Sequence, residues 1–315
     1  MNKARLIASY FLLAGAIMLW GCALAWGQAT SGEITGVVTD ASKAVIPGVE
    51  VIATNVATGI SRNGLTETNG LYRINLLQPG PYTVKASMTG FTTAVREGIT
   101  VSVGQMARVD LTLEVGNISE TVTVSGEASP IETEQGRVST LVDSKRILDM
   151  PLNGRNIYTL MTLAPGAVNS TATVTEPGAG GSDNTDTASV NGGRINFNGF
   201  WLDGVTNKGL SGGSSFAPTA DSIQEFRMET MNFSAEFGAS AGSVVNVVSK
   251  SGTNDFHGTA YEFLRNDNAD AREFFDDTKP EYKRNQFGAS FGGPIKKNST
   301  FFFTSYEGLR QSTGN

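Results

Sequence analysis

The sequence has few of the residues from which active sites and metal sites are usually built. Among its 315 residues there is one cysteine, Cys22, and one histidine, His257. A single imidazole excludes a metal site made of several histidines, and its place near an expected junction of two regions argues against a histidine-dependent triad. Neither a GxxxxGK phosphate loop nor a CxxC pair occurs. We therefore expect no enzyme activity, no cofactor and no metal.

Charge is scarce as well. Charged residues make up 17% of the chain, against about 25% in typical soluble domains, and the net charge is −6. This balance gives no reason to expect nucleic-acid binding. The 37 glycines, together with frequent Ser, Thr and Asn, are typical of turns and β-structure. Composition predicts a mainly β protein, and length suggests about two domains.

Residues 1–27 have the pattern of a secretory signal peptide. Lys3 and Arg5 form a basic start, an uncharged apolar run follows from Leu6 to Ala25, and small residues end it. An uncleaved membrane anchor is one alternative. A lipoprotein signal ending at Cys22 is another, although the bulky Trp20 stands where a small residue is usual. Cleavage would leave a mature chain without a thiol, stabilised by packing and sheet pairing alone.

Residues 31–115 predict a β-sandwich. Short β-forming runs recur between turn signals such as Thr68-Asn-Gly70, because Asn-Gly readily adopts the positive φ angles of tight turns. In one run Tyr82, Val84 and Ala86 alternate with polar residues, which predicts one buried face. The expected strands are Gly36–Asp40, Val49–Ala53, Leu71–Asn75, Tyr82–Ala86 and Val109–Val115.

Residues 116–129 are the expected linker to the next region. Ile118, Val122 and Val124 alternate with polar residues, which indicates an extended backbone. An exposed extended strand can pair with the sheet edge of another protein. An additional strand of the sandwich, or a plain linker, is the alternative.

Residues 130–254 combine helical and strand patterns. Apolar spacing predicts a short helix over Val138–Asp149, ended by Pro151, and another from Ile157 to Ala164 with Met161 in the core.

The second half of this region carries strand patterns separated by Gly- and Ser-rich loops. Phe200–Val205 predicts a strand that runs into an Asp203-Gly204 turn. Asp221–Asn254 predicts a charged strand, a Gly/Ala/Ser-rich passage and a second strand over Ser243–Ser249.

Residues 255–315 alternate with a period of two. Strands are expected at 256–266, 285–292 and 300–307, joined first by a long acidic segment and then by a short turn. The middle strand should point Phe287, Ala289 and Phe291 outward and Gln286, Gly288 and Ser290 inward. Such strands are typical of outer-membrane barrels. A soluble sheet is the alternative. Three strands cannot close a barrel, so we expect an N-terminal fragment of a longer protein.

Motifs in both halves of the chain resemble known families. GxVxD, PGVEV, TNGLYRI, LQPGPYTV and TGF are similar, in this order, to the carboxypeptidase regulatory-like, transthyretin-like β-sandwich. PLNGRN, LAPG, WLDGV, SIQEFRM and EFGASAGSVVNVVSKSG resemble the plug domain of TonB-dependent receptors. The segment ETMNFSA replaces the usual arginine–glycine turn and is the form of the Oar-like subgroup, which also carries the regulatory-like domain in front.

The resemblance implies a transthyretin-like β-sandwich, an α+β plug domain at 130–254, and the first strands of a transmembrane β-barrel at 255–315. The implied TonB box is Glu120, Thr121, Val122, Thr123 and Val124. The implied plug-motif residues are Asn153, Gly154, Arg155, Asp203, Gly204, Glu225, Arg227, Asn246 and Lys250.

Four charged residues have more specific expectations. Arg155 and Arg194 are expected to pair with acids of the barrel. Glu225 and Arg227 alternate with apolar residues, so they should form a polar strand face toward the barrel lumen. Asp203 also fits a purely structural role in its turn.

The resemblance implies an outer-membrane receptor that imports a bulky nutrient, with its N-terminal domains in the periplasm. Its partner would be a TonB-type energy-coupling protein in the periplasm, and its ligand a carbohydrate or a peptide. A secreted or surface-anchored β-sandwich protein for adhesion or carbohydrate binding is the alternative. A carboxypeptidase accessory chain is a third reading, without a catalytic zinc motif in the sequence.

Overall fold

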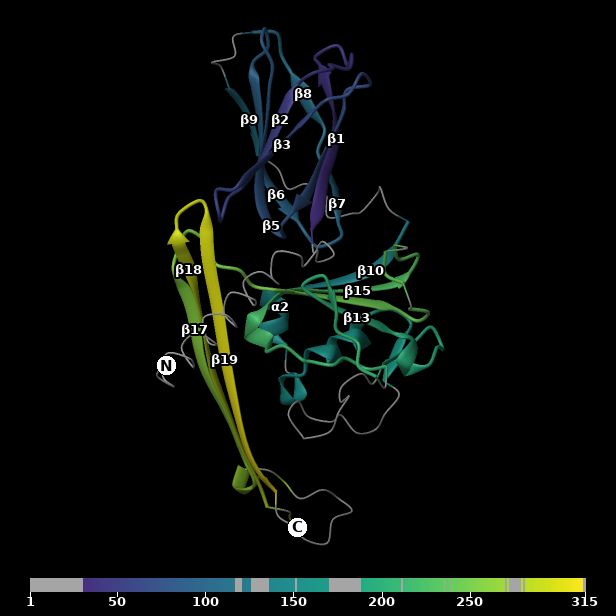
Figure 1. Ribbon diagram of the computed structural model, residues 1–315, viewed down its shortest axis with the longest axis vertical. Helices are drawn as coiled ribbons and strands as arrows, with labels where there is room; N and C mark the ends of the chain where they lie inside the picture. Colours follow the sequence, from purple (N-terminus) through teal and green to yellow (C-terminus); the bar gives the residue numbers. More distant parts are fainter. Residues whose placement is uncertain are drawn as a thin grey trace, which may run out of the picture.

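The computed structural model contains three β-sheet regions that follow one another along the chain (Figure 1). It describes residues 31–116, 121–125, 136–150, 152–169, 188–210, 212–234, 236–238, 240–269, 271, 279 and 281–313. The expected signal peptide and Glu120 lie outside these residues. Within them, no helix is long and apolar enough to cross a membrane. The prediction of a mainly β chain is confirmed.

The first region is a sandwich of two sheets, drawn at the top of Figure 1. One sheet contains β4 (Leu71–Leu77), β1 (Gly32–Asp40) and β7 (Met106–Arg108) in that order, with β8 (Leu111–Leu113) also paired to β1. The other contains β3 (Ser61–Leu65), β2 (Glu50–Asn55), β5 (Gly80–Ser87), β6 (Thr93–Val101) and β9 (Thr121–Ser125) in that order.

The inner faces of the two sheets form the core of the sandwich. Tyr82, Val84 and Ala86 are buried as their alternation predicts, and they pack with residues of the opposite sheet such as Tyr72. The hydroxyl of Tyr72 donates a hydrogen bond of 2.6 Å to the carbonyl of Val109. This polar contact satisfies a phenol that would be costly to bury alone. The region therefore holds together by apolar burial and sheet pairing, as expected for a chain segment without cysteine.

The middle region is built on a five-stranded sheet. Its order is β10 (Val138–Asp143), β15 (Ile223–Met231), β16 (Val244–Ser249), β13 (Gly199–Leu202) and β14 (Val205–Thr206). β13 runs parallel to β16, and the other neighbours are antiparallel. β11 (Ala167–Asn169) pairs with β12 (Ala188–Val190) outside this sheet. The short helices of the region are α2 (Ser144–Asp149), η2 (Asn153–Arg155), η3 (Ile157–Leu163), η4 (Ile195–Phe197) and η5 (Ala220–Ser222).

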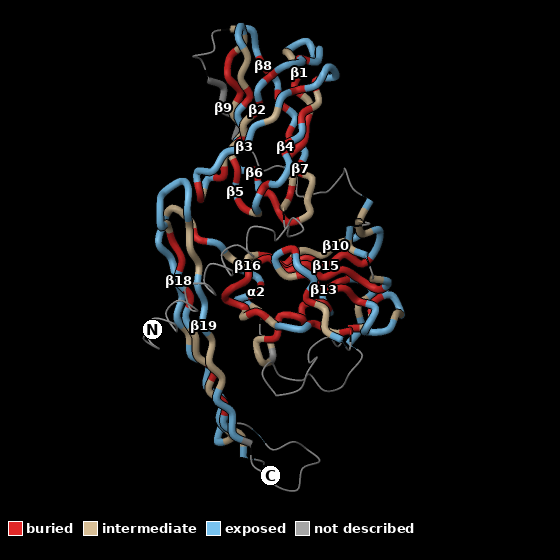
Figure 2. Tube along the Cα trace, viewed as in Figure 1, coloured by how far each residue is buried: buried red, intermediate tan, exposed pale blue. Residues whose placement is uncertain are grey.

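Helical segments cover the apolar face of this sheet. Ile147 of α2 and Met161 of η3 lie in one core cluster with Phe226 of β15 and Val247 of β16. The helical spacing from Ile157 and the core position of Met161 are thus confirmed, although η3 is a 3₁₀ helix. Figure 2 shows that β13, β15 and β16 are mostly buried.

The expected helix over Val138–Asp149 is wrong in its first half. β10 occupies Val138–Asp143 and pairs with β15, and α2 begins only afterwards. The carboxylate of Asp143 caps α2 by accepting a hydrogen bond of 2.8 Å from the backbone N–H of Arg146. A strand forms here although the apolar spacing fits a helix, because pairing provides hydrogen-bond partners for the backbone groups along the edge of β15.

The third region is an antiparallel sheet of three long strands. They are β17 (His257–Asn266), β18 (Tyr282–Lys296) and β19 (Thr300–Thr313), with η6 (Asp267–Ala269) after the first. β18 begins three residues before its expected start, because Tyr282–Arg284 continue the pairing with both neighbours. Gln286 and Ser290 are buried whereas Ala289 and Phe291 are exposed, which confirms the predicted faces. The sheet runs along one side of the middle region, and its upper end lies next to the lower end of the sandwich (Figure 1).

Candidate functional site

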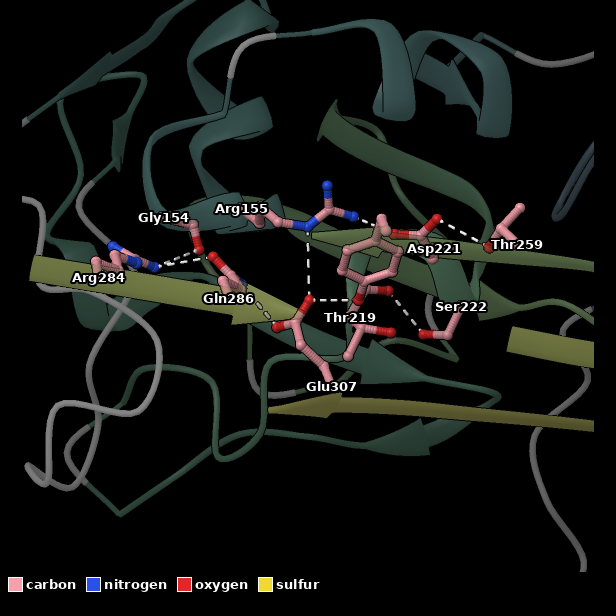
Figure 3. A network of polar contacts seen from close by, with 10 residues as sticks. Gly154, Arg155, Thr219, Asp221, Ser222, Thr259, Arg284, Gln286 and Glu307 are labelled. Atoms are coloured by element: carbon pink, nitrogen blue, oxygen red, sulfur yellow. Dashed lines mark hydrogen bonds and ion pairs between the residues drawn. The ribbon is translucent and has the colours of Figure 1, made fainter. Parts of the chain in front are cut away.

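A tight turn at η2 brings Arg155 to the third region. Gly154 has a φ of 64° and Arg155 a φ of 56°, both in the left-handed range. Glycine adopts this range readily, whereas arginine does so uncommonly. The turn directs the Arg155 side chain toward β17 and β19, where its partners lie (Figure 3).

Arg155 is the centre of a largely buried ion cluster, in which Asp221 is the buried member. Its Nη2 pairs with Asp221 of η5, and its Nε lies 3.5 Å from Oε2 of Glu307 in β19. The three side chains are 15%, 8% and 18% exposed, in that order. The guanidinium also lies over the rings of Tyr261 and Phe263, 4.5 and 4.7 Å from their centroids. Ion pairs and ring contacts together compensate for taking this charge out of water.

The polar face of the three strands extends the cluster. Tyr261 donates a hydrogen bond of 2.6 Å from its hydroxyl to Glu307, and Gln286 donates one of 2.8 Å to the other oxygen of that carboxylate. Thr259 donates one of 3.3 Å to Asp221. Each strand of the third region thus contributes a hydrogen-bonding side chain to the junction with the middle region.

Two features of β18 complete the junction. Arg284 donates hydrogen bonds to the carbonyl of Gly154, at 3.4 Å, and to Gln286, at 3.1 Å. Gly288 lies between Tyr261 and Glu307 in the register, and a Cβ there would collide with the Tyr261 hydroxyl. The absence of a side chain at Gly288 lets Tyr261 reach across β18. The middle region is therefore seated against the inward polar face.

Arg155 does pair with an acid of β19, Glu307, while the assignment of β19 to a barrel stays a prediction. Arg194 is exposed and forms no ion pair with any residue that the structure describes, so its pairing stays a prediction.

A second cluster joins β15 to the sandwich. The backbone N–H of Val103, in the loop after β6, donates a hydrogen bond of 2.8 Å to Oε2 of Glu225. Nη1 of Arg227 donates one of 3.1 Å to the carbonyl of Val103. All three residues are buried. The expectation that Glu225 and Arg227 face the barrel lumen is wrong, because the sandwich loop covers this polar face and both backbone groups of Val103 need partners there.

Charges alternate in sign along this cluster. Glu229 lies 3.4 Å from Nε of Arg227 and 3.2 Å from Nη1 of Arg137. Arg227 also donates a hydrogen bond of 3.1 Å to Ser139 of β10. Burial raises the pKa of the Glu225 carboxyl, and this outweighs the lowering by its hydrogen bonds and by Arg227.

Of the other plug-motif residues, Asn153 lies with Gly154 in η2, whereas Asp203, Gly204, Asn246 and Lys250 lie in or beside β16. Asp203 has a φ of 49° and Gly204 one of 78°, so the predicted turn is confirmed. The carboxylate of Asp203 accepts hydrogen bonds of 2.8 Å from both the N–H and the hydroxyl of Ser249. Burial lowers the pKa of the Lys250 amine, opposed by Asp221. Asn246 is buried in β16, and its Oδ1 has no hydrogen-bond partner among the described residues.

The strand expected between the first two regions is present as β9. It pairs in parallel with β6, in a register that runs from Thr93 opposite Thr121 to Glu97 opposite Ser125. The prediction of an extended backbone is confirmed. Among the described strands β9 is the last of its sheet. Its position therefore fits the alternative of an additional strand of the sandwich. A TonB box at 120–124 stays a prediction.

A third junction lies at Asn254, between β16 and β17. Its backbone N–H donates a hydrogen bond of 3.0 Å to the carbonyl of Ala57 in the sandwich. Its side chain exchanges two hydrogen bonds with Asn298, of 2.7 and 2.8 Å, in the turn between β18 and β19. All three regions therefore meet at this residue.

The passage before β16 contains one spacing known from hydrolases. Gly238–Gly242 reads GASAG, which fits the GxSxG pattern of a nucleophile elbow. That elbow needs a strand before the serine and a helix after it, whereas here Ser240 lies in a loop before a strand. The chain's single imidazole, on His257, contacts Thr253 and Asp255 instead of Ser240. The arrangement supports no catalytic role for Ser240.

Sequence reasoning did not single out three residues that the junctions depend on. Glu307 could have been found as an acid within an otherwise aromatic strand, and Asp221 as an acid just before a strand. Val103 acts through its backbone, for which the sequence contains no signal.

Comparison with known proteins agrees with this arrangement. Residues 33–114 match the carboxypeptidase regulatory-like domain, and residues 248–315 match the outer membrane beta barrel domain. The TonB-dependent transporter Oar of Myxococcus xanthus is 27% identical over an alignment 325 residues long. The alignment includes 97% of this chain. The chain is a homologue of Oar. It spans 29% of the length of that relative. The predicted resemblance and the outer-membrane location are confirmed.

Solved structures similar to this Oar homologue are more distant. The siderophore receptor PirA from Acinetobacter baumannii has a TM-score of 0.40 and 18% identity, covering 56% of this chain and 24% of the receptor. A putative carbohydrate binding protein from Pseudomonas aeruginosa has a TM-score of 0.21 and 20% identity, covering 28% of this chain and 92% of that protein.

Proposed function

We propose that this Oar homologue is a TonB-dependent outer-membrane transporter that imports a bulky nutrient. In this proposal residues 130–254 form the plug and residues 255–315 the first strands of the barrel. The sandwich and the linker lie in the periplasm. The homology to Oar and the barrel-domain match favour this reading over a secreted adhesion protein.

The observation that carries the proposal is the ion cluster around Arg155. Arg155 and Asp221 belong to the middle region, whereas Glu307 belongs to β19. A barrel with apolar residues outside and polar residues inside would present this polar face to its lumen. The contact of the middle region with that face supports the proposal that it is a plug.

We propose a transport role without catalysis, and a carbohydrate or peptide ligand. Thr259 and Gln286 of the inward face are hydrogen-bonded to Asp221 and Glu307. The proposed ligand class therefore rests on the family resemblance and not on these side chains.

The proposed partner is a TonB-type energy-coupling protein that binds the strand at 120–124. Strand addition uses backbone N–H and C=O groups, so a proline, which lacks the N–H, should weaken binding. The test compares wild type with Val122→Pro in a pull-down with the periplasmic domain of the coupling protein. Thr123→Ala is the matched control, because it keeps the backbone donor.

We expect Val122→Pro to lose at least about tenfold in affinity and Thr123→Ala to bind as wild type does. Equal binding by wild type and Val122→Pro would reject this strand as the coupling site.

A further inference from the structure

The proposed coupling strand is already paired within its own chain. Residues Thr121–Ser125 form five consecutive pairs with Thr93–Glu97 of β6. Strand addition by another protein would use the same kind of backbone hydrogen bond. The coupling protein must therefore either compete with β6 for the same edge of this strand or pair with its other edge.

β9 has two backbone edges at which another strand can pair. One faces β6 and is occupied in the structure. The other is the outer edge of the five-stranded sheet, which ends with β9 in its described strand order. A partner could displace β9 from β6, or add to its outer edge and leave the pairing intact.

The strand that holds β9 is itself fixed to the middle region. β6 ends at Val101, and two residues later Val103 makes its hydrogen bonds to Glu225 and Arg227 of β15. Both of these side chains are at most 6% exposed. β6 therefore has a fixed position relative to the proposed plug, which makes it a firm template for β9.

We propose that the sandwich is a lock for the coupling strand. In the resting protein Thr121–Ser125 is held as the edge strand on β6, and the energy-coupling protein binds it only after displacing it from that edge. This inference rests on the proposed function, because it assigns a resting place to the same strand. The regulatory-like domain then sets how much of the strand is available to the coupling protein.

A disulfide across the β6–β9 pair tests the lock. Val95 lies opposite Thr123, and neighbouring strands are about 4.8 Å apart, within the range of about 4.4–6.8 Å between Cα atoms that a disulfide spans. The variant is Val95→Cys with Thr123→Cys, in the full protein with Cys22→Ser so that no other thiol is present. The matched control is Ile52→Cys with Asn63→Cys, which joins β2 to β3 in the same sheet away from β9.

The readout is binding of the coupling protein's periplasmic domain before and after reduction. Apparent affinity falls in proportion to the fraction of competent molecules, so the oxidised variant should bind at least about tenfold more weakly than the reduced one. The control pair should bind equally in both states. Equal binding by the oxidised and reduced forms of the β6–β9 pair would overturn the lock and indicate addition to the outer edge. Weaker binding by the oxidised control would overturn it too, since sandwich stiffness would then be the cause.

Hydrogen exchange provides a second test without engineered cysteines. Displacement removes the partner of β6, so addition of the coupling protein to the wild-type protein should speed exchange within Thr93–Glu97. Unchanged or slower exchange there would refute displacement. Failure of the proposed function gives a different result, because Val122→Pro would then bind the coupling protein as well as wild type does.

Discussion

Replacing Arg155 by methionine is expected to weaken the contact between the middle region and β17–β19, so that this junction opens more often. Methionine keeps an apolar stem against the rings of Tyr261 and Phe263 but removes the positive charge. Asp221 and Glu307 would then remain as two carboxylates, 8% and 18% exposed, without their shared counter-ion. The change therefore isolates the ionic part of the junction.

The size of the effect follows from this burial. Removing one partner of a fully buried ion pair costs about 3–5 kcal/mol. This is an upper limit here, because Arg155 and Glu307 are partly exposed and Glu307 keeps its hydrogen bonds from Tyr261 and Gln286. At about 1.4 kcal/mol per factor of ten, local opening of the junction becomes at most roughly 100- to 4,000-fold more frequent. Arg155→Lys should have an intermediate effect, since an ammonium keeps the charge but lacks the planar fork that serves two carboxylates.

Hydrogen exchange of the peptide covering η2 and η3 measures this opening in the full protein in detergent. Amides in a locally opening segment exchange at a rate set by the opening free energy. Arg194→Met is the control, because Arg194 is exposed and has no ion pair among the described residues. A change of less than about threefold for Arg155→Met, or an equal change for the control, would refute the role assigned to the cluster.

Three further predictions concern single contacts. Gly288→Val should lower the stability of the third region by about 1–3 kcal/mol through the collision with Tyr261, seen as a lower unfolding temperature, whereas an unchanged temperature would contradict the close approach. Burial raises the pKa of Glu225 in the folded protein, so the stability that this carboxyl contributes is present below the ordinary glutamate range and is lost as pH rises through the raised pKa. The unfolding free energy of wild type relative to Glu225→Gln should therefore fall over that pH window, and a difference that stays constant with pH would be inconsistent with this. Tyr72→Phe should cost about 1–2 kcal/mol in denaturant unfolding of the sandwich, since the carbonyl of Val109 loses a buried donor; a midpoint equal to that of wild type would argue against this contact.

Periodicity predicted which residues face inward but not what they would face. The alternation around Tyr82 and the inward set of β18 both follow from the two-residue repeat of a strand. Glu225 and Arg227 do form a polar strand face, yet their neighbour is the Val103 loop. Which surface covers a face depends on contacts between residues more than 120 positions apart, and no local pattern encodes them.

The apolar spacing also gave a wrong prediction where pairing with a neighbouring strand determined the backbone conformation. Val138–Asp143 has apolar residues at positions that fit a helix, and a strand forms there because β15 offers unpaired backbone groups. Register is a further property that periodicity leaves open. The alignment of Tyr261, Gly288 and Glu307 across three strands depends on it.

The two junctions of the sandwich limit how it can move. It is joined to the rest of the protein at Val103, by Glu225 and Arg227, and at Ala57, by the backbone of Asn254. Two such junctions among the described residues favour rotation of the sandwich about the axis that joins them over other motions, and β9 would turn with it. Breaking either contact converts this rotation into a swing about the remaining point, so the order in which the two contacts open determines the path that β9 follows.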